Sequence, residues 1–198
     1  MDEKKLWVFA GPNGSGKSTI INRYLVERLP MINPDIIAHE IDPLRINEPD
    51  VHLKAGKIAL QRRKEYLQEG ISFALETTLS GTSEIKFIND TSTAGYQVNI
   101  VYVAVKNSMQ NVSRVELRVE RGGHNVPPED IVRRYDRSMS NIALLLKMVD
   151  RCYIIDNSDL PHLCAVVING RVRTRRKILP DWVSKIIGGS YEKLIRLK

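Results

Sequence analysis

The residues Gly11-Pro12-Asn13-Gly14-Ser15-Gly16-Lys17-Ser18-Thr19 place four residues between two glycines, and Lys-Ser follows the second glycine. This spacing is the P-loop pattern, whose glycines allow backbone N–H groups to surround phosphates at the positive end of a helix. An apolar run from Leu6 to Ala10 precedes it and is typical of a buried strand, while Lys17 to Leu29 has helical spacing. Because strand, loop and helix follow one another as the pattern requires, Gly11 to Thr19 predict a nucleotide-binding site.

Two side chains of this loop have expected chemical roles. In P-loops the lysine reaches the β- and γ-phosphates of the nucleotide, and the hydroxyl after it binds Mg²⁺. We therefore expect Lys17 to act on the phosphates and Ser18 to be a ligand of Mg²⁺. Both ATP and GTP are open as the phosphate donor.

Apolar runs typical of strands alternate with helical segments along the whole chain. The longest β-branched run, Val98 to Val105, predicts a central strand. Asn169-Gly170 between two apolar runs predicts a hairpin of residues 164–168 and 172–178. Further strands are expected at 72–75 and 152–155, and helices at 51–69, 83–94, 108–120, 128–149 and from 181 onwards. The pattern predicts one α/β domain over 1–198, with a parallel sheet flanked by helices and the C-terminal β-hairpin at its edge.

Length and composition restrict the class of protein. The 198 residues suffice for about one domain, and 42% hydrophobic with 27% charged residues is near the globular average. No apolar run approaches the roughly 18 residues of a membrane span, and the N-terminus lacks the long apolar region of a signal peptide. Cys152 and Cys164 stand in apolar surroundings, which favours buried thiols in a reducing compartment. We expect a cytoplasmic protein without a membrane partner.

Positive charge is concentrated in the C-terminal half. Residues 1–99 contain 12 Lys and Arg against 13 Asp and Glu, a balance of −1, whereas residues 100–198 contain 18 against 10, a balance of +8. This asymmetry favours a phosphate-bearing small molecule or a nucleic acid as partner. Five cations surround the predicted hairpin: Arg171, Arg173, Arg175, Arg176 and Lys177. They either bind nucleic-acid phosphates or prevent a solvated edge strand from pairing with other sheets. The lack of interleaved aromatic residues favours the edge strand.

The remaining motifs narrow the class of P-loop protein. A small GTPase would carry an Asn-Lys-x-Asp motif, which this sequence lacks, and an ATP-driven motor would usually show a strand ending in Asp-Glu. The nearest candidate, Tyr153 to Asp156, continues into Asn157-Ser158 instead. A small phosphotransferase remains, which needs an acceptor site, a carboxylate to take the hydroxyl proton, and arginines for the transferring charge.

Asp35 and Glu76 are the candidate carboxylates. Asp35 follows a short apolar step, and Glu76 ends a strand-like segment. Ligands of α/β sheets collect at the carboxyl ends of the strands, so both side chains should face the γ-phosphate. The alternatives are that Asp35 caps a short helix over Ile36–His39, and that Glu76 with Thr77 and Thr78 forms only a polar turn.

Two groups of arginines flank a Gly/Pro-rich turn. They are Arg114, Arg118 and Arg121, spaced four and three apart before the turn, and Arg133, Arg134 and Arg137 after it. Two helices with such side chains are typical of a lid, here about 108–150, that closes basic groups over bound phosphates. We expect Arg121 and Arg134 to hold phosphate, with His124 as a further candidate. The alternative is a solvated helix face.

In combination, these segments resemble the zeta-toxin family of P-loop kinases. The matching segments are Gly11–Thr19, Asn33–Asp35, Leu75–Gly81, Arg118–Asn125, Arg134-Tyr135 and Asp156–Ser158. The resemblance covers about residues 5 to 170 and implies a nucleotide-kinase-like P-loop NTPase fold that uses ATP or GTP with Mg²⁺. It implies that Asp35 is the base that activates the acceptor hydroxyl, and that Glu76, with the adjacent Thr77, binds the acceptor. Phosphate contacts are implied for Lys17, Arg121 and Arg134.

The resemblance also bears on substrate and partners. The best-studied members phosphorylate the 3′-hydroxyl of the amino sugar in UDP-N-acetylglucosamine, so a UDP-sugar acceptor and a separate antitoxin protein are implied. The segment Ile36 to Glu40 departs from the family, whose well-known toxins carry a Phe- and Arg-bearing stretch there. The leading hypothesis is a kinase acting on a hydroxyl of a small molecule, either a UDP-sugar or another metabolite. The alternatives are a nucleic-acid-associated NTPase and a binding module without catalysis.

Overall fold

A seven-stranded sheet organises the computed structural model, which describes residues 3–24, 29–46, 48–123 and 125–195. The strands lie in the order β2-β3-β1-β4-β5-β6-β7. The first five are parallel, and β6 and β7 run antiparallel to their neighbours. Their bounds are β1 Lys5–Ala10, β2 Met31–Ile32, β3 Phe73–Thr77, β4 Gln97–Ala104, β5 Arg151–Asp156, β6 His162–Ile168 and β7 Arg171–Arg175. The expected α/β fold with an antiparallel C-terminal hairpin is confirmed.

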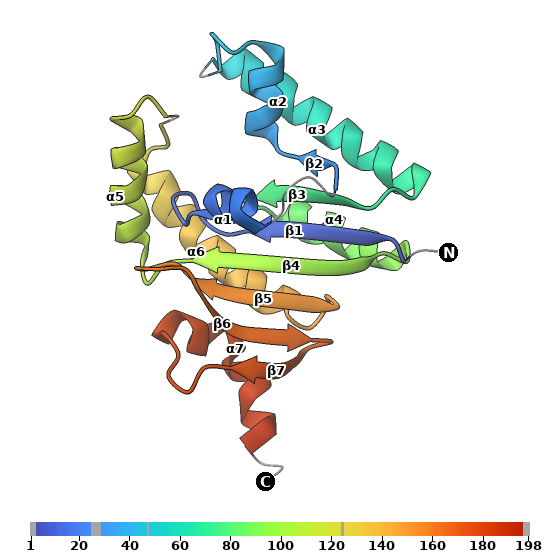
Figure 1. Cartoon of the computed structure of the whole chain (residues 1–198), viewed down its shortest axis with the longest axis vertical. Coiled ribbons are helices and arrows are strands. Elements are labelled where there is room, and N and C mark those ends of the chain that lie inside the picture. Colours follow the sequence, from blue (N-terminus) through green and yellow to red (C-terminus); the bar gives the residue numbers. More distant parts are fainter. Residues whose placement is uncertain (1–2, 25–28, 47, 124, 196–198) are drawn as a thin grey trace.

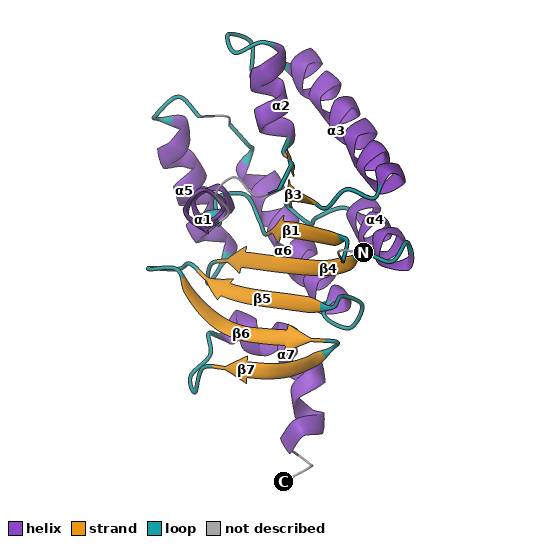
Figure 2. Ribbon diagram, turned by 45° about the vertical axis from the view of Figure 1, so that its right-hand side comes forward, coloured by secondary structure: helices purple, strands orange, loops and turns teal. Residues whose placement is uncertain are grey.

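Helices cover both faces of this sheet and extend beyond one edge. They are α1 Lys17–Tyr24, α2 Pro34–Ile41, α3 Pro49–Glu69, α4 Thr82–Thr93, α5 Ser108–Val119, α6 Pro128–Leu145 and α7 Asp181–Ile195. Figures 1 and 2 show α1 on one face and α4, α6 and α7 on the other, while α2 and α3 project beyond β2. The helix predicted from Lys17 to Leu29 is described only as far as Tyr24, because residues 25–28 lie outside the described ranges.

The alternation of side chains along β1 explains how one strand contributes to two cores. Leu6, Val8 and Ala10 belong to the larger core beneath α4, α6 and α7. Phe9 belongs to the smaller core with Ile20 and Ile21 of α1. Successive side chains of a strand point to opposite faces, so a strand covered on both sides must be apolar throughout. This requirement is why β1 and β4 could be predicted from short apolar runs.

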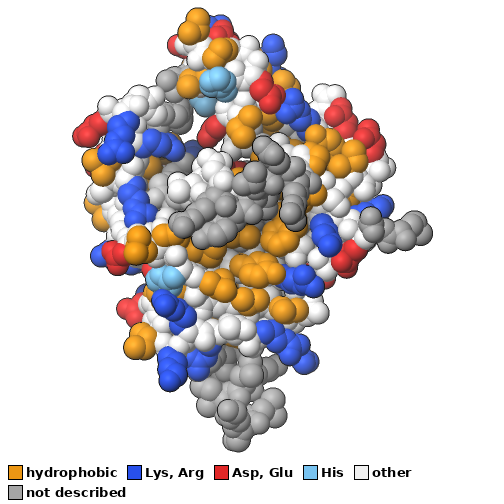
Figure 3. Space-filling view, in the orientation of Figure 1, with side chains coloured by type: hydrophobic (Ala, Val, Ile, Leu, Met, Phe, Trp, Pro, Cys, Tyr) orange, Lys and Arg blue, Asp and Glu red, His pale blue; other side chains and the backbone are white. Residues whose placement is uncertain are grey.

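The hairpin at the sheet edge follows from its two turn residues. Asn169 and Gly170 have φ angles of 47° and 71°, the left-handed values that a two-residue type I′ turn requires at both positions. The turn joins β6 to β7, which is the edge strand and carries exposed Arg171 and Arg175. Figure 3 shows basic side chains gathered around this part of the sheet. β4, β5 and β6 separate β7 from the P-loop strand β1.

Burial of the two cysteines agrees with their apolar sequence surroundings. Both thiols are free and buried, and burial raises the pKa of each above its ordinary value. Neither is therefore activated as a thiolate. Within the described ranges, no helix combines the length and the apolar character that crossing a bilayer requires.

Candidate active site

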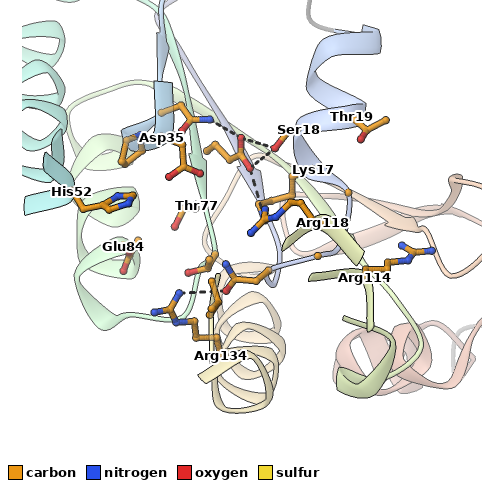
Figure 4. Close-up of a pocket in the computed structure, with 18 of the residues that line it drawn as sticks. Lys17, Ser18, Thr19, Asp35, His52, Thr77, Glu84, Arg114, Arg118 and Arg134 are labelled. Atoms are coloured by element: carbon orange, nitrogen blue, oxygen red, sulfur yellow. Dashed lines mark hydrogen bonds and ion pairs between the residues drawn. The ribbon is translucent and has the colours of Figure 1, made fainter. Parts of the chain in front are cut away.

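A polar cavity of about 610 Å³ lies at the carboxyl ends of the parallel strands. Its walls come from the P-loop, from residues 33–35 and 76–78 after β2 and at the end of β3, and from side chains of α3, α4, α5 and α6. Figure 4 shows Lys17, Asp35 and Arg134 around one space, although they come from distant parts of the chain. Ligands of parallel sheets bind at this end of the strands, so the cavity is the candidate active site.

Lys17 lies buried at the floor of this cavity. Its Nζ donates to the carbonyl oxygens of Gly11 at 2.7 Å and Pro12 at 3.0 Å, and lies 3.9 Å from Oε1 of Glu76. Burial lowers the pKa of Lys17 to about 8, against the opposing effect of the Glu76 and Asp35 carboxylates. At neutral pH the ammonium is therefore mostly charged and is held at the place where phosphates would bind.

The backbone of the P-loop is packed so closely that its glycines leave no room for a side chain. A Cβ at Gly11, whose φ is +147°, would overlap the carbonyl of Val103, and a Cβ at Gly16 would overlap the amide of Asn157. Asn157 Nδ2 donates to the carbonyl of Ser15 at 2.8 Å. The segment after β5 thus holds the P-loop in place through Asn157. The family resemblance also implies that residues 156–158 lie near the nucleotide.

Glu76 lies against the P-loop. Its carboxylate accepts from Ser18 Oγ at 3.1 and 3.3 Å and from Asn33 Nδ2 at 2.8 Å. The family resemblance predicts Glu76 in the acceptor site, and in the structure its carboxylate contacts Ser18 and Lys17, because β3 pairs directly with β1. Thr77 also lines the cavity, and its hydroxyl accepts from the N–H of Leu79.

The donors at this point suit a magnesium ion. Mg²⁺ prefers oxygen ligands and usually takes one or two from protein, with water and substrate phosphates completing its shell. Ser18 supplies a hydroxyl and Glu76 a carboxylate on the same wall of the cavity. No cluster of three or more His, Cys, Asp or Glu residues exists among the described residues, so an all-protein cage for a metal is not formed there.

Asp35 lies in the first turn of α2 with its carboxylate directed into the cavity (Figure 4). The N-cap of α2 is Asn33, whose side chain accepts from the N–H of Asp35 at 2.8 Å. The alternative that Asp35 itself caps the helix is therefore wrong. Its carboxylate does not cap the helix and lines the cavity, where it can act on a ligand.

Of the six arginines that flank the Gly/Pro-rich turn, Arg114, Arg118 and Arg134 line the cavity, whereas Arg121 does not. Arg134 Nη1 donates to Asn13 Oδ1 at 3.4 Å, and Arg114 Nη2 donates to the carbonyl of Ser158 at 2.9 Å. Arg118 is the third. Arg121 is exposed in the turn after α5, which ends at Val119, so it does not continue the helix face of Arg114 and Arg118. His124 lies outside the described residues.

Sequence reasoning missed several residues of the cavity. Asn33, His52, Arg63 and Glu84 all line it. Asn33 precedes Pro34, a combination typical of a helix start. His52 and Arg63 are eleven residues apart, about three helical turns, which places both on one face of the predicted helix. These signals were present, but the sequence does not indicate which helix face meets the P-loop.

Comparison with known proteins identifies the family. The family model described as Zeta toxin matches residues 2–163. The chain belongs to the zeta toxin family. An uncharacterized protein of Haemophilus influenzae is 34% identical over 142 residues, which cover 67% of this chain and 98% of that protein. The resemblance based on the motifs is thereby confirmed.

Solved structures agree with the architecture. A chain of the AvrRxo1-ORF1:AvrRxo1-ORF2 structure with sulphate ions superposes with a TM-score of 0.69 at 16% identity, covering 93% of this chain and 64% of that one. The same complex was also solved with ATP. A chain of the PezAT chromosomal toxin–antitoxin system of Streptococcus pneumoniae gives a TM-score of 0.63 at 15% identity, covering 100% and 85%. This chain spans slightly less than two thirds of the AvrRxo1 chain. Such low identities show the fold, and family and fold together support a P-loop phosphotransferase.

Proposed function

We propose that this zeta toxin-family chain is a kinase that transfers the γ-phosphoryl group of ATP to a hydroxyl group of a small molecule. The observation that carries the proposal is that one cavity contains the P-loop lysine, the carboxylate of Asp35, which does not cap its helix, and several arginines. Phosphoryl transfer requires little more than this arrangement, because its catalysis consists mainly of positioning and charge stabilisation.

Each group has a defined part in the proposed reaction. Lys17 exchanges its carbonyl partners for the β- and γ-phosphates, and Arg118 and Arg134 bind the equatorial oxygens of the transferring group. Asp35 accepts the proton of the acceptor hydroxyl. The oxygen of this hydroxyl forms a bond to the γ-phosphorus, while the bond between the γ-phosphorus and the bridging oxygen breaks and ADP leaves. Mg²⁺, held by Ser18 and Glu76, would neutralise negative charge on the phosphates.

The finer parts of the proposal rest on the family. UDP-N-acetylglucosamine is the first acceptor to test, GTP the alternative donor, and a separate antitoxin the proposed protein partner, as in the toxin–antitoxin system PezAT. Residues 1–198 would form one kinase domain in which α5 and α6, within about 108–150, act as the lid. A cytoplasmic location agrees with a nucleotide substrate.

Incubation with Mg²⁺ and ATP or GTP, with and without UDP-N-acetylglucosamine, tests the proposed activity. Mass spectrometry should find one added phosphoryl group on the acceptor and an equal amount of nucleoside diphosphate. Nucleotide consumption that requires added DNA or RNA would instead favour the nucleic-acid-associated NTPase. Absence of nucleotide binding would leave only the non-catalytic binding module.

The arginine positions give a direct prediction about turnover. Arg118→Ala and Arg134→Ala should each lower turnover at least about tenfold, because charge on the equatorial oxygens loses a partner inside the cavity. The melting temperature should change little, since both side chains lie on the cavity wall. Steady-state kinetics and thermal unfolding of the purified variants check this result.

Arg133 is the matched control on the same helix. Its Nη2 pairs with Asp130 Oδ1 at 2.8 Å outside the cavity, so Arg133→Ala should leave turnover nearly unchanged. Arg121→Ala tests the sequence-based expectation that Arg121 holds phosphate. It should leave turnover nearly unchanged, because Arg118 lines the cavity and Arg121 does not. Equal losses at Arg133 and Arg134 would contradict a specific phosphate site and indicate general electrostatics.

The pKa of Lys17 predicts how nucleotide binding depends on pH. A lysine with a pKa of about 8 is half neutral at that pH, whereas bound phosphates raise its pKa again. Nucleotide binding should therefore take up a proton above about pH 8, and affinity should fall as pH rises through that value. Calorimetry in buffers of different ionisation enthalpy measures the proton uptake. Lys17→Ala should remove it.

A further inference from the structure

The cavity extends well beyond the groups that the proposed transfer uses. His52 and Arg63 of α3 both line it, together with Glu84 of α4. Arg63 follows His52 by eleven positions, a rise of about 16 Å along the axis of α3. The far wall is therefore long enough to contact an elongated ligand whose reacting hydroxyl lies near Asp35.

Arg63 is the unusual residue of this wall. Its guanidinium carbon lies 5.2 Å from the centroid of the Phe87 ring, and its Nε is buried without a hydrogen-bond partner. Among the described residues no carboxylate lies within 4.0 Å of its guanidinium nitrogens. Burial lowers the pKa of Arg63, and the carboxylate of Glu84 opposes this effect. An arginine remains charged even so, and a half-buried charge without a paired acid is costly in the free protein.

Other arginines on or near the cavity wall form hydrogen bonds or ion pairs within the protein, whereas Arg63 forms none with the described residues. Arg62, the preceding residue, forms an ion pair with Glu40 at 3.0 Å. Arg114 donates to a carbonyl, and Arg134 has both Asn13 and Asp130 as partners. Glu84 accepts from Ser83 Oγ at 3.1 Å and does not reach Arg63 within ion-pair distance. The planar fork of Arg63 is thus held against an aromatic ring with hydrogen-bonding capacity unused at the cavity wall.

We propose that Arg63 is a specificity-determining residue of the acceptor pocket, and that the acceptor carries a phosphate or carboxylate group that Arg63 binds. This anionic group is separate from the hydroxyl that receives the γ-phosphoryl group. A guanidinium matches two oxygens of either anion with two parallel N–H donors. The inference rests on the proposed kinase function, because it deepens the acceptor site of that reaction. Neutral sugars and nucleosides would leave Arg63 unpaired and are poor acceptors.

Nuclear magnetic resonance of the arginine Nε–H groups tests this site directly. The protein is first saturated with Mg²⁺ and a non-hydrolysable ATP analogue, so that the P-loop cannot bind the probe. Inorganic phosphate and acetate are then titrated separately. The Arg63 Nε–H signal should shift to saturation at concentrations at least tenfold lower than any shift of Arg62. The tighter of the two probes identifies phosphate or carboxylate as the recognised group.

Variants of Arg63 assign its Nε–H signal and distinguish a loss of probe affinity from a loss of folding. Arg63→Met keeps the length of the side chain and an apolar contact with Phe87, and it should lose at least tenfold in affinity for the probe measured by calorimetry. Arg63→Lys, which keeps the charge without the planar fork, should lie between this variant and the parent. Arg62→Met should bind the probe within about twofold of the parent. Thermal unfolding confirms that each variant is folded.

Two kinds of failure are distinguishable. If the ATP analogue does not bind, the proposed kinase function is overturned and the inference falls with it. If the analogue binds while Arg63 does not respond to either anion, only the inference is overturned. Equal losses of probe affinity in Arg62→Met and Arg63→Met would also overturn the inference, because they would show that the probe responds to the positive charge of α3 in general and not to Arg63.

Discussion

Lys17→Ala is expected to lower nucleotide turnover by at least about 10²-fold while the protein remains folded. The ammonium is held among the carbonyls of Gly11 and Pro12 and the Glu76 carboxylate, which fixes this cation in the P-loop. Burial lowers the pKa of Lys17, which means that keeping its ammonium charged in the folded protein costs unfolding free energy. Removing the side chain also removes this cost, so the melting temperature should stay equal or rise.

The measurement is steady-state turnover of ATP beside thermal unfolding. Lys57→Ala, an exposed position on α3, is the matched control and should match the parent in both. Turnover by Lys17→Ala at the parental rate would overturn the P-loop assignment. A collapse of the melting temperature would show that Lys17 is needed for folding instead.

Local rules account for the parts of the fold that could be predicted. The P-loop combines a spacing of glycines with a strand before it and a helix after it, and no distant residue is needed to recognise it. β4 is mostly apolar and buried from Val98 onwards because helices cover both faces of the sheet there. Asn169-Gly170 predicts the hairpin because two left-handed residues in succession are costly for most other residue pairs.

The placements in the site that the sequence did not predict arise from helix ends and from strand neighbours. The spacing of Arg114, Arg118 and Arg121 predicts one helix face, but α5 ends at Val119, and residues in the following turn no longer share that face. Glu76 lies beside Lys17 because β3 neighbours β1, and strand order is not encoded in a local pattern. Arg63 was overlooked for the same reason, since only packing decides which face of α3 meets the cavity.

Asp35 is where sequence and structure together support a catalytic role. The sequence left two interpretations open, a helix cap and a general base. The structure assigns the cap to Asn33, whose Oδ1 accepts from the backbone of Asp35. A carboxylate in the first turn of α2 interacts favourably with the helix dipole, and Asp35 in addition lines the cavity that holds the P-loop lysine, where it can act as a base.

Asp35→Asn is therefore expected to lower turnover by about 10² to 10⁴-fold, the usual contribution of a general base. Nucleotide affinity should change little, because Asp35 contributes only a secondary electrostatic effect at Lys17. Stability should also change little, whereas Asn33→Ala removes the helix cap and should cost about 0.5–2 kcal/mol of unfolding free energy. Asp50→Asn, at an exposed ion pair with Arg45, is the control carboxylate and should leave turnover unchanged. If Asp35→Asn instead loses stability at full turnover, the proton of the acceptor hydroxyl must go to another group.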